Sequence, residues 1–571
     1  MGLTKRWSIK EVDAQLVSEL QASLRVHPAI CSMLVARGIY TYDQAKLFFR
    51  PQLTDLHDPF LMKGMQKAVD RICSAIEWNE RILIYGDYDV DGTSSVAVVY
   101  SFLKSLYAGQ LNYYIPHRYR EGYGLSKQGI DYAKANGHTL LITLDCGIKS
   151  ADLVDYANSL NIDVIICDHH LPDNRIPNAL AILNPKQEDC TYPYKELSAC
   201  GIGFKLIEAL AIQLNKPKEQ VYAYLDLVAT SIAADIVALD GENRVLGYYG
   251  IKKANEQPSL SLKTLLEASD FKRTLQMSDL VFVIGPRVNA AGRMDDAKKA
   301  VQLFIEKDYS KALAIGSLLQ QDNLDRREAD TTITEEALAE IELDPNHASK
   351  KSSVVFQSHW HKGVVGIVAS RLIEKHYKPT IVLTQSGEVV TGSARSVIGF
   401  NLYEALHACR AHLIGYGGHF AAAGMTLALE NLEAFKNAFE QAVAERITPE
   451  QLIPEIVINA VIPIDSINMN FYQIITQMEP FGPDNMRPLF LAKNVYDTGY
   501  SKLAKEAHIS FNITQGNQIL KGIGYNMAQH MGIVKSGKPF DVVFQLQLNE
   551  WQGTQTVQMQ VLDLKESGSY N

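Results

Sequence analysis

The stretch RILIYGDYDVDGTSS, residues 81–95, decides the fold of this chain. A short apolar run is followed there by a glycine and by Asp87, Asp89 and Asp91. Such a run, ended by a turn residue and acidic groups, indicates a buried strand of a parallel sheet. If the backbone stays extended, a spacing of two residues points all three carboxylates to the same side of the strand. Carboxylates so close repel each other and require a cation, although an acidic hairpin turn built on the DG pair is an equal alternative.

The same pattern recurs downstream, with an apolar run followed by a turn residue or an acid. The recurrences are LNYYIP at 111–116, LLITLDCG at 140–147 and DVIICDHH at 163–170. Amphipathic stretches of helical length separate these runs and start near Gly92, Ser126 and Lys149. This alternation predicts an α/β fold with a parallel sheet. Because ligands gather at the carboxyl ends of parallel strands, the acids there mark the candidate site.

Two of these strands end in residues that bind metals. Asp145 ends the run LLITLD, and Asp168, His169 and His170 end the run VIICDHH. Carboxylate oxygen and imidazole nitrogen together suit Mn²⁺ or a similar divalent ion better than calcium. The competing interpretations are a helix N-cap for Asp145 and a buried, hydrogen-bonded pair for the two histidines.

A further acid, Asp235, lies in DLVATSIAADIVAL, residues 226–239, which otherwise predicts a buried apolar helix. An ionised carboxylate in such a helix is costly without a partner. Metal coordination would supply one, and so would an ion pair with Arg244 or Arg287. Carboxylates from successive strand ends together with an imidazole can hold two cations about 3.5–4 Å apart, the arrangement used for attack on phosphates.

Length and composition limit the classes of protein to consider. At 571 residues the chain is too long for one core, and about three or four domains are expected. Hydrophobic residues at 47% and charged residues at 21% are ordinary globular values, which exclude a fibrous or wholly disordered protein. The seven cysteines contain no CxxC pair, so we interpret them as buried thiols in a reducing compartment.

Charge and targeting signals narrow the classes further. A net charge of −9 argues against a protein that coats duplex DNA, although cations held in a carboxylate cluster would offset that charge locally. The first residues contain no secretion signal, and no apolar run is long enough to span a membrane. We therefore expect a cytoplasmic protein without a membrane segment.

The rest of the chain predicts three more regions. From 297 to about 341 the sequence is charged and contains one glycine, Gly316, which predicts one extended helix. A second α/β unit, with VVFQ and PTIVLTQ as strands, is expected from about 352 to 445. After about residue 454, short alternating runs such as EIVINAVIPI predict a small OB-like β-barrel.

The motifs taken together resemble the DHH phosphoesterase superfamily, which is named for the triplet that stands here at 168–170. GDYDVDG, TLDCG, CDHH and the later aspartate occur in that family's order. PHRYREGYGLS, GPRVNAAGRM, HWHKGVVGIVASRL, GSARS and GYGGHFAAAG are similar to its RecJ branch. The segment PFGPDN departs from the usual pattern, because Asp484 stands where glycine is expected.

The resemblance implies a domain order. It comprises an N-terminal helical segment at 1–50, a parallel-sheet DHH catalytic domain at 51–296, a connecting helix at 297–345, a DHH-associated α/β domain at 346–450 and an OB-like domain at 451–571.

The resemblance also implies roles at the candidate site. The metal ligands would be Asp89, Asp91, Asp145, His169 and Asp235. Asp145 would bridge two ions, Mn²⁺ or Mg²⁺. Asp87, Asp168 and His170 would orient these ligands or contact the substrate phosphate, and Arg287 would lie near the phosphate that is cut.

Binding of a 5′ end would need arginine, hydroxyl and backbone donors. The resemblance favours Arg118, Ser393 and Arg395 for this role. Gly417 and Gly418 allow backbone N–H groups to approach a phosphate, with His419 beside them, although a tight turn would need the same glycines. For any single arginine the alternative is an ordinary ion pair. We also expect an Asn-Ala-Ala-Gly turn between Arg287 and Arg293. Aromatic residues such as Trp360 could stack on bases, although most aromatic side chains belong to the core.

By resemblance, the expected function is hydrolysis of single-stranded DNA from the 5′ end to 5′ mononucleotides, in repair and recombination. A helicase and a single-strand-binding protein are the expected partners. The alternatives are a phosphodiesterase for oligoribonucleotides or cyclic dinucleotides, and a non-catalytic scaffold that binds single strands.

Overall fold

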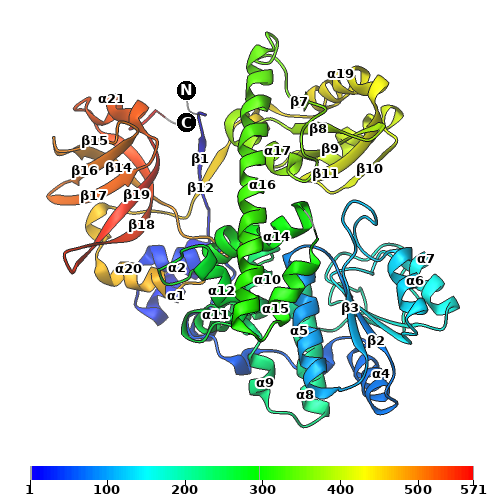
Figure 1. The fold of residues 1–571 in the computed structure, drawn as a ribbon. Coiled ribbons are helices and arrows are strands. Elements are labelled where there is room, and N and C mark those ends of the chain that lie inside the picture. The colour runs from blue at the N-terminus through cyan, green and yellow to red at the C-terminus, as the bar shows by residue number, and fades with distance from the viewer. Residues whose placement is uncertain (1–2, 295, 570–571) are drawn as a thin grey trace. The chain divides into compact units, whose positions relative to one another are not determined.

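The structure is a computed structural model that describes residues 3–294 and 296–569. It divides into two compact units. Figure 1 labels their helices and strands. Unit 1 comprises Met1–Gly38, Asp325–Ile475 and Pro488–Asn571, and unit 2 comprises Ile39–Leu324 and Thr476–Arg487. The candidate metal ligands all belong to unit 2, so its fold positions the site.

Unit 2 is built around a five-stranded sheet in which every strand pairs in parallel with its neighbours. The order β3-β2-β4-β5-β6 is formed by β2 (Ile82–Gly86), β3 (Leu111–Tyr114), β4 (Leu140–Leu144), β5 (Asp163–Cys167) and β6 (Ala181–Leu183). The predicted parallel sheet is therefore confirmed, and β6 is an additional short strand. Strands β2 and β4 are buried along their whole length, which explains their continuous apolar runs.

Helices separate these strands where the amphipathic stretches predicted them. They are α5 (Val90–Leu106), α6 (Lys127–Ala135) and α7 (Ala151–Ser159). Gly86, the last residue of β2, has no room for a side chain, because a Cβ there would lie 2.3 Å from a methyl carbon of Val96 on α5. The sheet and α5 can therefore pack together closely at the start of that helix.

The expectation that the strand stays extended through its aspartates is wrong. Strand β2 ends at Gly86, and α5 begins at Val90. Asp89 is the N-cap of α5, and its Oδ1 accepts a hydrogen bond of 3.0 Å from the backbone N–H of Gly92. Asp91 lies in the first helical turn. The DG pair forms part of a helix start rather than a hairpin, because aspartate is a strong N-cap.

Apolar helices complete the core of unit 2. Helix α8 (Ala199–Gln213) and α10 (Leu225–Ala234) pack against each other and against α5. The predicted buried helix around Asp235 is confirmed, but it ends at Ala234, and Asp235 is its C-cap. The other α-helices of unit 2 before residue 280 are α3 (Tyr42–Phe49), α4 (Met65–Glu77), α9 (Lys218–Tyr222), α11 (Gly241–Glu256), α12 (Leu260–Ala268) and α13 (Met277–Asp279).

The turn expected between Arg287 and Arg293 is wrong, because these residues lie on one helix. A π-helical turn, η3 (Leu280–Ile284), leads directly into α14 (Gly285–Met294). Gly292 allows α14 to approach the backbone before α5, since a Cβ on it would lie 2.9 Å from the carbonyl oxygen of Tyr88. The two alanines between the arginines favour a helix over a turn.

The single helix expected from residue 297 is interrupted. Helix α15 (Lys298–Ile305) is followed by a break, and α16 runs from Tyr309 to Leu343. The carboxylate of Glu306 accepts hydrogen bonds of 2.7 and 2.8 Å from the backbone N–H groups of Lys307 and Asp308. These local bonds compete with helical ones, which explains the break. The division between the units falls within α16.

Unit 1 contains a five-stranded sheet of order β10-β11-β9-β8-β7. Its strands are β7 (Ser353–Phe356), β8 (Thr380–Ser386), β9 (Val389–Arg395), β10 (Gly415–Gly418) and β11 (Ala422–Ala428). Its helices are α17 (Val365–His376), α18 (Leu402–Ala408) and α19 (Leu432–Ala444). The two predicted strands are confirmed as β7 and β8. The motifs GSARS and GYGGHFAAAG, which were not predicted as strands, form much of the other three.

The C-terminal part of unit 1 is rich in β-strands, as predicted. One seven-stranded sheet contains β13 (Ala460–Val461), β14 (Phe490–Asp497), β15 (Lys502–Ala504), β16 (His508–Gln515), β17 (Gln518–Gly524), β18 (Phe540–Trp551) and β19 (Thr554–Glu566). Strand β1 (Arg6–Ile9) pairs in parallel with β12 (Glu455–Ile458). The helices of this part and of the N-terminal segment are α1 (Ala14–Leu24), α2 (Pro28–Val35), α20 (Met469–Thr476) and α21 (Met531–Val534).

The segment PFGPDN belongs to unit 2, although residues of unit 1 precede and follow it in the chain. The backbone N–H of Leu239 donates a hydrogen bond of 2.8 Å to the carbonyl of Pro483. Asp484 has a φ of 58°, so it occupies the left-handed region that glycine adopts most easily. This aspartate therefore keeps the backbone conformation for which a glycine was expected. Across the described ranges, no helix has the length and apolar character needed to cross a membrane.

Candidate metal centre

The candidate metal centre lies at the carboxyl ends of β2, β4 and β5. Asp87, Asp145 and Asp168 directly follow these strands, as the sequence predicted. The start of α5 adds Asp89 and Asp91, and the end of α10 adds Asp235. Four segments that are far apart in the chain, around residues 87–91, 145, 168–169 and 235, therefore converge on one place.

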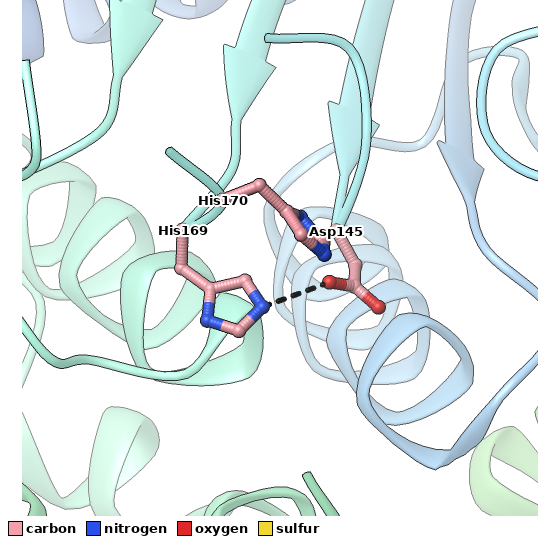
Figure 2. Close-up of side chains that lie close together, drawn as sticks. All are labelled: Asp145, His169 and His170. Atoms are coloured by element: carbon pink, nitrogen blue, oxygen red, sulfur yellow. Dashed lines mark ion pairs between the residues drawn. The ribbon is translucent and has the colours of Figure 1, made fainter. Parts of the chain in front are cut away.

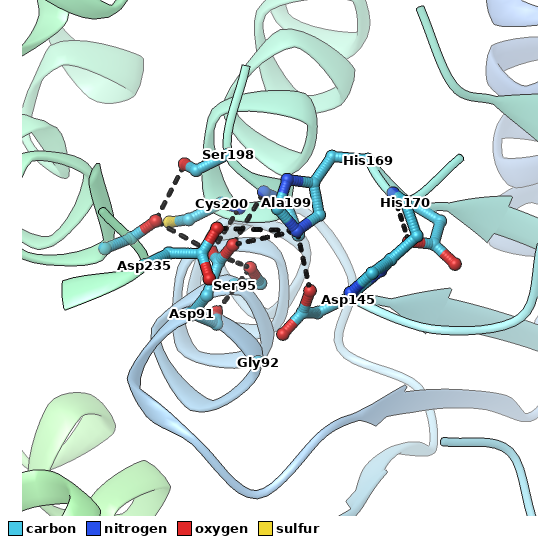
Figure 3. Close-up of polar contacts among 12 residues, drawn as sticks. Asp91, Gly92, Ser95, Asp145, His169, His170, Ser198, Ala199, Cys200 and Asp235 are labelled. Atoms are coloured by element: carbon cyan, nitrogen blue, oxygen red, sulfur yellow. Dashed lines mark hydrogen bonds and ion pairs between the residues drawn. The ribbon is translucent and has the colours of Figure 1, made fainter. Parts of the chain in front are cut away.

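His169 lies at the centre of a ring of carboxylates (Figure 3). Its Nε2 is 3.3 Å from Asp145 Oδ1, 3.5 Å from Asp235 Oδ2 and 3.9 Å from Asp91 Oδ2. Burial lowers the pKa of this histidine, so its imidazole is neutral at pH 7 and able to donate a lone pair. The alternative of a fully hydrogen-bonded core histidine does not fit His169, because its buried Nδ1 has no hydrogen-bond partner among the described residues.

The potential ligand atoms form three overlapping groups, each within 4.8 Å. They are Asp91 with His169 and Asp235, Asp87 with Asp89 and Asp145, and Asp145 with His169 and His170. Figure 2 shows the last group, in which the Asp145 carboxylate points toward the ring of His169. Asp145 belongs to two groups, which places it between the carboxylates that follow β2 and the imidazoles that follow β5.

Asp145 is held in an unfavourable state by the fold. Its φ is 62°, and its side chain is 3% exposed. Its Oδ1 has no hydrogen-bond donor within the described part of the chain. Burial, reinforced by Asp91, Asp89 and Asp235, raises the pKa of Asp145 well above its usual value. The N-cap alternative is wrong, because Ser150 is the N-cap of α7.

Two more carboxylates share this electrostatic strain. Burial, together with the charges of Asp91 and Asp89, raises the pKa of Asp235 to about 9. Burial and the neighbouring Asp89 raise the pKa of Asp87 well above its usual value. A cluster of acids that cannot all ionise at pH 7 is the environment that divalent cations stabilise. The buried oxygens and the neutral imidazole fit such ions.

An ion pair with Arg244 or Arg287, the alternative to metal coordination, is not the main influence on the pKa of Asp235. The positive group that lowers its pKa is Lys186, whose effect is smaller than that of burial and of the neighbouring acids. Arg244 donates hydrogen bonds to the backbone carbonyls of Phe48, Met478 and Glu479. Arg287 donates to the carbonyl of Val283.

Asp91 differs from the other acids because protein donors hold it in place. Its oxygens accept hydrogen bonds of 2.8 Å from the backbone N–H groups of Ala199 and Cys200 (Figure 3). They also accept one of 2.7 Å from the hydroxyl of Ser231. The two N–H groups form the start of α8, where the helix dipole favours negative charge. Sequence reasoning missed this contact, although Ser198 before an apolar run is an N-cap signal for that helix.

Asp168 and His170 form a separate pair beside the ring of carboxylates. The Nδ1 of His170 is 2.7 Å from Asp168 Oδ1, and Asp168 also accepts from the backbone N–H of Ile148 at 3.0 Å. Burial opposes ionisation of Asp168, but the hydrogen bond from His170 lowers its pKa below the usual value. The hydroxyl of Tyr123 is 3.0 Å from Nε2 of His170. This pair is therefore satisfied by protein contacts.

The three candidate arginines of unit 2 have different surroundings. The guanidinium of Arg118 lies 4.8 Å from the centre of the Tyr88 ring and lowers the pKa of Asp87, against the larger effect of burial. Arg287 is 9% exposed. Tyr119 donates a hydrogen bond of 2.6 Å to the carbonyl of Arg293. The structure thus brings Arg118 close to the acids that follow β2.

Ser393 and Arg395 lie together on β9 in unit 1. Nη1 of Arg395 donates a hydrogen bond of 2.8 Å to Oγ of Ser393. Both face the first turn of α17, because a Cβ on Gly366 would lie 2.9 Å from Nη2 of Arg395 and 3.0 Å from Oγ of Ser393. A guanidinium and a hydroxyl beside a helix N-terminus are groups that bind anions.

The glycines of the GGH motif lie on an exposed edge of the same sheet. Gly417 pairs with Gly424, which pairs with Ser393, so all three face the same side of the sheet. A Cβ on Gly417 would contact nothing within 4 Å, whereas Gly418 has a φ of 154° and its Cβ would lie 2.4 Å from the carbonyl oxygen of Ala422. Gly418 is required by the hairpin, and Gly417 is not. His419 is exposed beside them.

The stacking role considered for Trp360 is wrong. Its side chain is 3% exposed and donates a hydrogen bond of 2.7 Å to Glu336 on α16.

Three family models match this chain in the expected order. The N-terminal domain of the DHH family matches residues 81–232, the DHHA1 domain matches 350–445, and the RecJ OB domain matches 458–563. A Bacillus subtilis protein named single-stranded-DNA-specific exonuclease RecJ is 36% identical over 98% of this chain and 70% of the relative. The chain belongs to the RecJ family. A RecJ of the same name from Salmonella typhimurium is 32% identical over 97% of this chain and 98% of that protein.

Solved RecJ structures have the same fold. The crystal structure of RecJ from Thermus thermophilus in complex with Mn²⁺ matches with a TM-score of 0.84 at 26% identity, over 99% of this chain and 80% of that chain. An exonuclease RecJ bound to manganese matches with a TM-score of 0.61 at 30% identity, over 70% of this chain and 98% of that chain. The predicted α/β architecture with a β-rich OB-like part is thereby confirmed.

Proposed function

We propose that this chain is a metal-dependent exonuclease that hydrolyses single-stranded DNA from its 5′ end and releases 5′ mononucleotides. The observation that carries the proposal is the ring of Asp91, Asp145 and Asp235 oxygens within 3.9 Å of the neutral Nε2 of His169. This donor set favours divalent ions such as Mn²⁺. The names of the RecJ relatives support single-stranded DNA as the substrate.

The proposed ligands of two ions, Mn²⁺ or Mg²⁺, are Asp89, Asp91, Asp145, His169 and Asp235. The overlap of their groups at Asp145 supports a bridging role for that carboxylate. Bound divalent ions would activate water and neutralise the charge that develops on the phosphate oxygens. The side chains would orient and retain the ions. The Asp91 carboxylate is already fixed for this role by hydrogen bonds from the start of α8 and from Ser231.

The groups around these ligands have supporting roles in the proposal. Against the effect of burial, the hydrogen bond with Asp168 raises the pKa of His170 and keeps its ring oriented. The protonated ring could then donate a hydrogen bond from Nε2 to a substrate oxygen in place of its contact with Tyr123. Asp87 adds negative charge next to Asp89 and Asp145. Arg287 has little solvent around it, so its charge would act strongly on a nearby phosphate.

Recognition of a 5′ phosphate is proposed for Arg118, Ser393 and Arg395. The contact of Ser393 and Arg395 with the first turn of α17 supports this role, because it combines a charge, a hydroxyl and helix N–H groups. Gly417, Gly418 and His419 would contact the next phosphates of the strand through exposed backbone N–H groups and an imidazole.

In the cell, we propose that the enzyme works in the cytoplasm in DNA repair and recombination. A helicase and a single-strand-binding protein would supply its substrate, since the proposed reaction needs unpaired DNA.

The test uses single-stranded and blunt duplex DNA labelled at either the 5′ or the 3′ end, with Mn²⁺ or with chelator. Labelled mononucleotide released first from the 5′-labelled single strand, and only with the metal, is the expected result. The Asp145→Asn variant controls for contaminating nucleases. Release from the 3′ end, internal cuts, or binding without turnover would contradict the proposal, and the last of these would support a scaffold.

A further inference from the structure

The residue that follows Asp235 has an unfavourable backbone conformation. Ile236 has a φ of 59°, a left-handed value that β-branched residues avoid because their Cβ crowds the following carbonyl. Its side chain is 65% exposed, so burial does not compensate for this strain. Neither the backbone nor the core gains from an isoleucine at this position. Strain that the fold does not explain points to a functional contact.

A second apolar side chain is exposed on the neighbouring element. Phe282 is 76% exposed and stands in the middle of the π-helical turn η3. Leu280 and Ile284, at the two ends of the turn, are fully buried. The buried ends fix the turn on the core while Phe282 projects into solvent. Turns of this kind are frequent at functional sites.

The two residues belong to elements that pack against each other. Helix α10 contacts η3, and a Cβ on Gly285, just after the turn, would lie 3.6 Å from the Cβ of Ala234. Ala234 directly precedes Asp235. The two exposed apolar side chains therefore belong to neighbouring segments that meet at the end of α10, where a proposed cation ligand stands.

We propose that Ile236 and Phe282 form an apolar lip that binds the base of the nucleotide whose phosphate lies at the cation cluster. This inference rests on the proposed function. The base is the flat, apolar part of a nucleotide, and it stacks on aromatic rings whatever its identity. In a duplex both faces of an inner base are covered by neighbouring bases. The lip therefore favours unpaired DNA and gives a reason for the exposed apolar groups on two segments that meet next to Asp235.

The test compares two 5′-phosphorylated thymidine oligonucleotides, one of which carries abasic residues at its first two positions. For the wild-type protein, KM for the abasic strand is expected to exceed KM for the normal strand by about tenfold, the range of one stacked base. In the double variant Ile236→Asn, Phe282→Ser this ratio is expected to fall toward one, because removal of the base costs affinity only when the lip is present to bind it.

Stability provides an independent readout. Asparagine tolerates a positive φ, so Ile236→Asn alone is expected to raise Tm while it weakens substrate binding. Loss of a merely structural contact would lower Tm instead. Ile212→Asn is the matched control, since Ile212 is 44% exposed and lies about 20 Å along α8 from its start at the cluster. Trp78→Ser, at a residue that is 75% exposed just before β2, controls for Phe282.

An unchanged KM ratio in the double variant would overturn the inference, and so would an equal change in the control variants. A wild-type protein that hydrolyses neither strand would instead contradict the proposed function. In that case fluorescence anisotropy gives the ratio of the affinities of the two oligonucleotides for the wild type and the double variant. A ratio that falls toward one in the double variant supports the lip, and an unchanged ratio contradicts it.

Discussion

The cation cluster proposed in unit 2 and the anion-binding surface proposed in unit 1, around Ser393 and Arg395, hold charge in opposite ways. In unit 2, burial and the charges of neighbouring aspartates raise the pKa values of Asp87, Asp145 and Asp235. In unit 1, Ser393 and Arg395 contact each other beside a helix start, and the glycines next to them are exposed. The first arrangement needs an added positive charge to be stable, and the second is complete without a ligand.

This difference separates chemistry from recognition. Burial strengthens every electrostatic interaction, so the buried cluster is suited to stabilise a developing charge. The groups at the surface of unit 1 can keep much of their hydration when no ligand is bound. They are therefore suited to hold a phosphate reversibly. Changes in unit 2 should therefore reduce kcat, whereas changes at the surface of unit 1 should raise KM.

The largest effect is expected for Asp145→Asn. Its rate should fall well beyond the roughly 100-fold that marks the loss of a residue that only orients a ligand. The Tm of the metal-free protein should rise, because burial and the neighbouring acids oppose ionisation of the Asp145 carboxyl, and the amide removes that cost. Steady-state kinetics and thermal melts in chelator measure the two effects. Asp152→Asn is the control, since its side chain is 90% exposed on α7. A loss of Tm together with activity would mean that Asp145 is structural.

A smaller effect of a different kind is expected for Arg395→Ala. KM for a 5′-phosphorylated strand should rise about 10- to 100-fold, the range for one hydrogen bond to a charged group, with a much smaller change in kcat. A strand with a 5′ hydroxyl should show little change in KM. Arg410→Ala, at an exposed arginine of the same unit, is the control. A fall in kcat on both strands would remove the distinction between the two regions.

The adjacent glycines of β10 sharpen the comparison within unit 1. Gly418→Ala should lower Tm, because its Cβ would lie 2.4 Å from the carbonyl oxygen of Ala422. Gly417→Ala should leave Tm unchanged, because a Cβ there meets nothing within 4 Å, and should raise KM severalfold if a strand approaches this backbone. Melting curves and KM values separate the two effects. Equal KM values for Gly417→Ala and the wild type would exclude the glycine from the binding surface.

The smallest effect is a shift of stability with pH. In the metal-free fold the pKa of Asp235 is about 9, against 3.8 as its ordinary value, so the folded state binds more protons between these values. Stability from this group is present at low pH and is lost as pH rises through about 9. Metal-free Tm should therefore fall over this range, and the rise in Tm caused by Mn²⁺ should grow with pH. A Mn²⁺ effect that is independent of pH would show that protons and cations do not compete.

The sequence predicted the part of the fold that follows from periodicity. The apolar runs at β2, β4 and β5 identified a parallel sheet, and the acids after them identified its active edge. These predictions succeed because burial on both faces leaves a continuous apolar run and because parallel strands share one carboxyl end.

Local geometry could not be predicted in the same way. Asp89 and Asp91 belong to a helix start rather than a strand, since the choice depends on packing of α5 against the sheet. The left-handed backbone of Asp145 and the bond from Ser231 to Asp91 depend on contacts between distant segments. The GGH motif forms a strand because β11 offers it a partner, which glycine propensity alone disfavours.

The most direct test of the cation cluster is anomalous diffraction from crystals grown with Mn²⁺, recorded at the manganese absorption edge. Two anomalous peaks about 3.5–4 Å apart are expected, with Asp145 between them and His169 Nε2 as the nitrogen ligand of one. Crystals that show no peak within reach of Asp91, Asp145, His169 and Asp235 would contradict the account, because the buried carboxylates would then be stable without the ions.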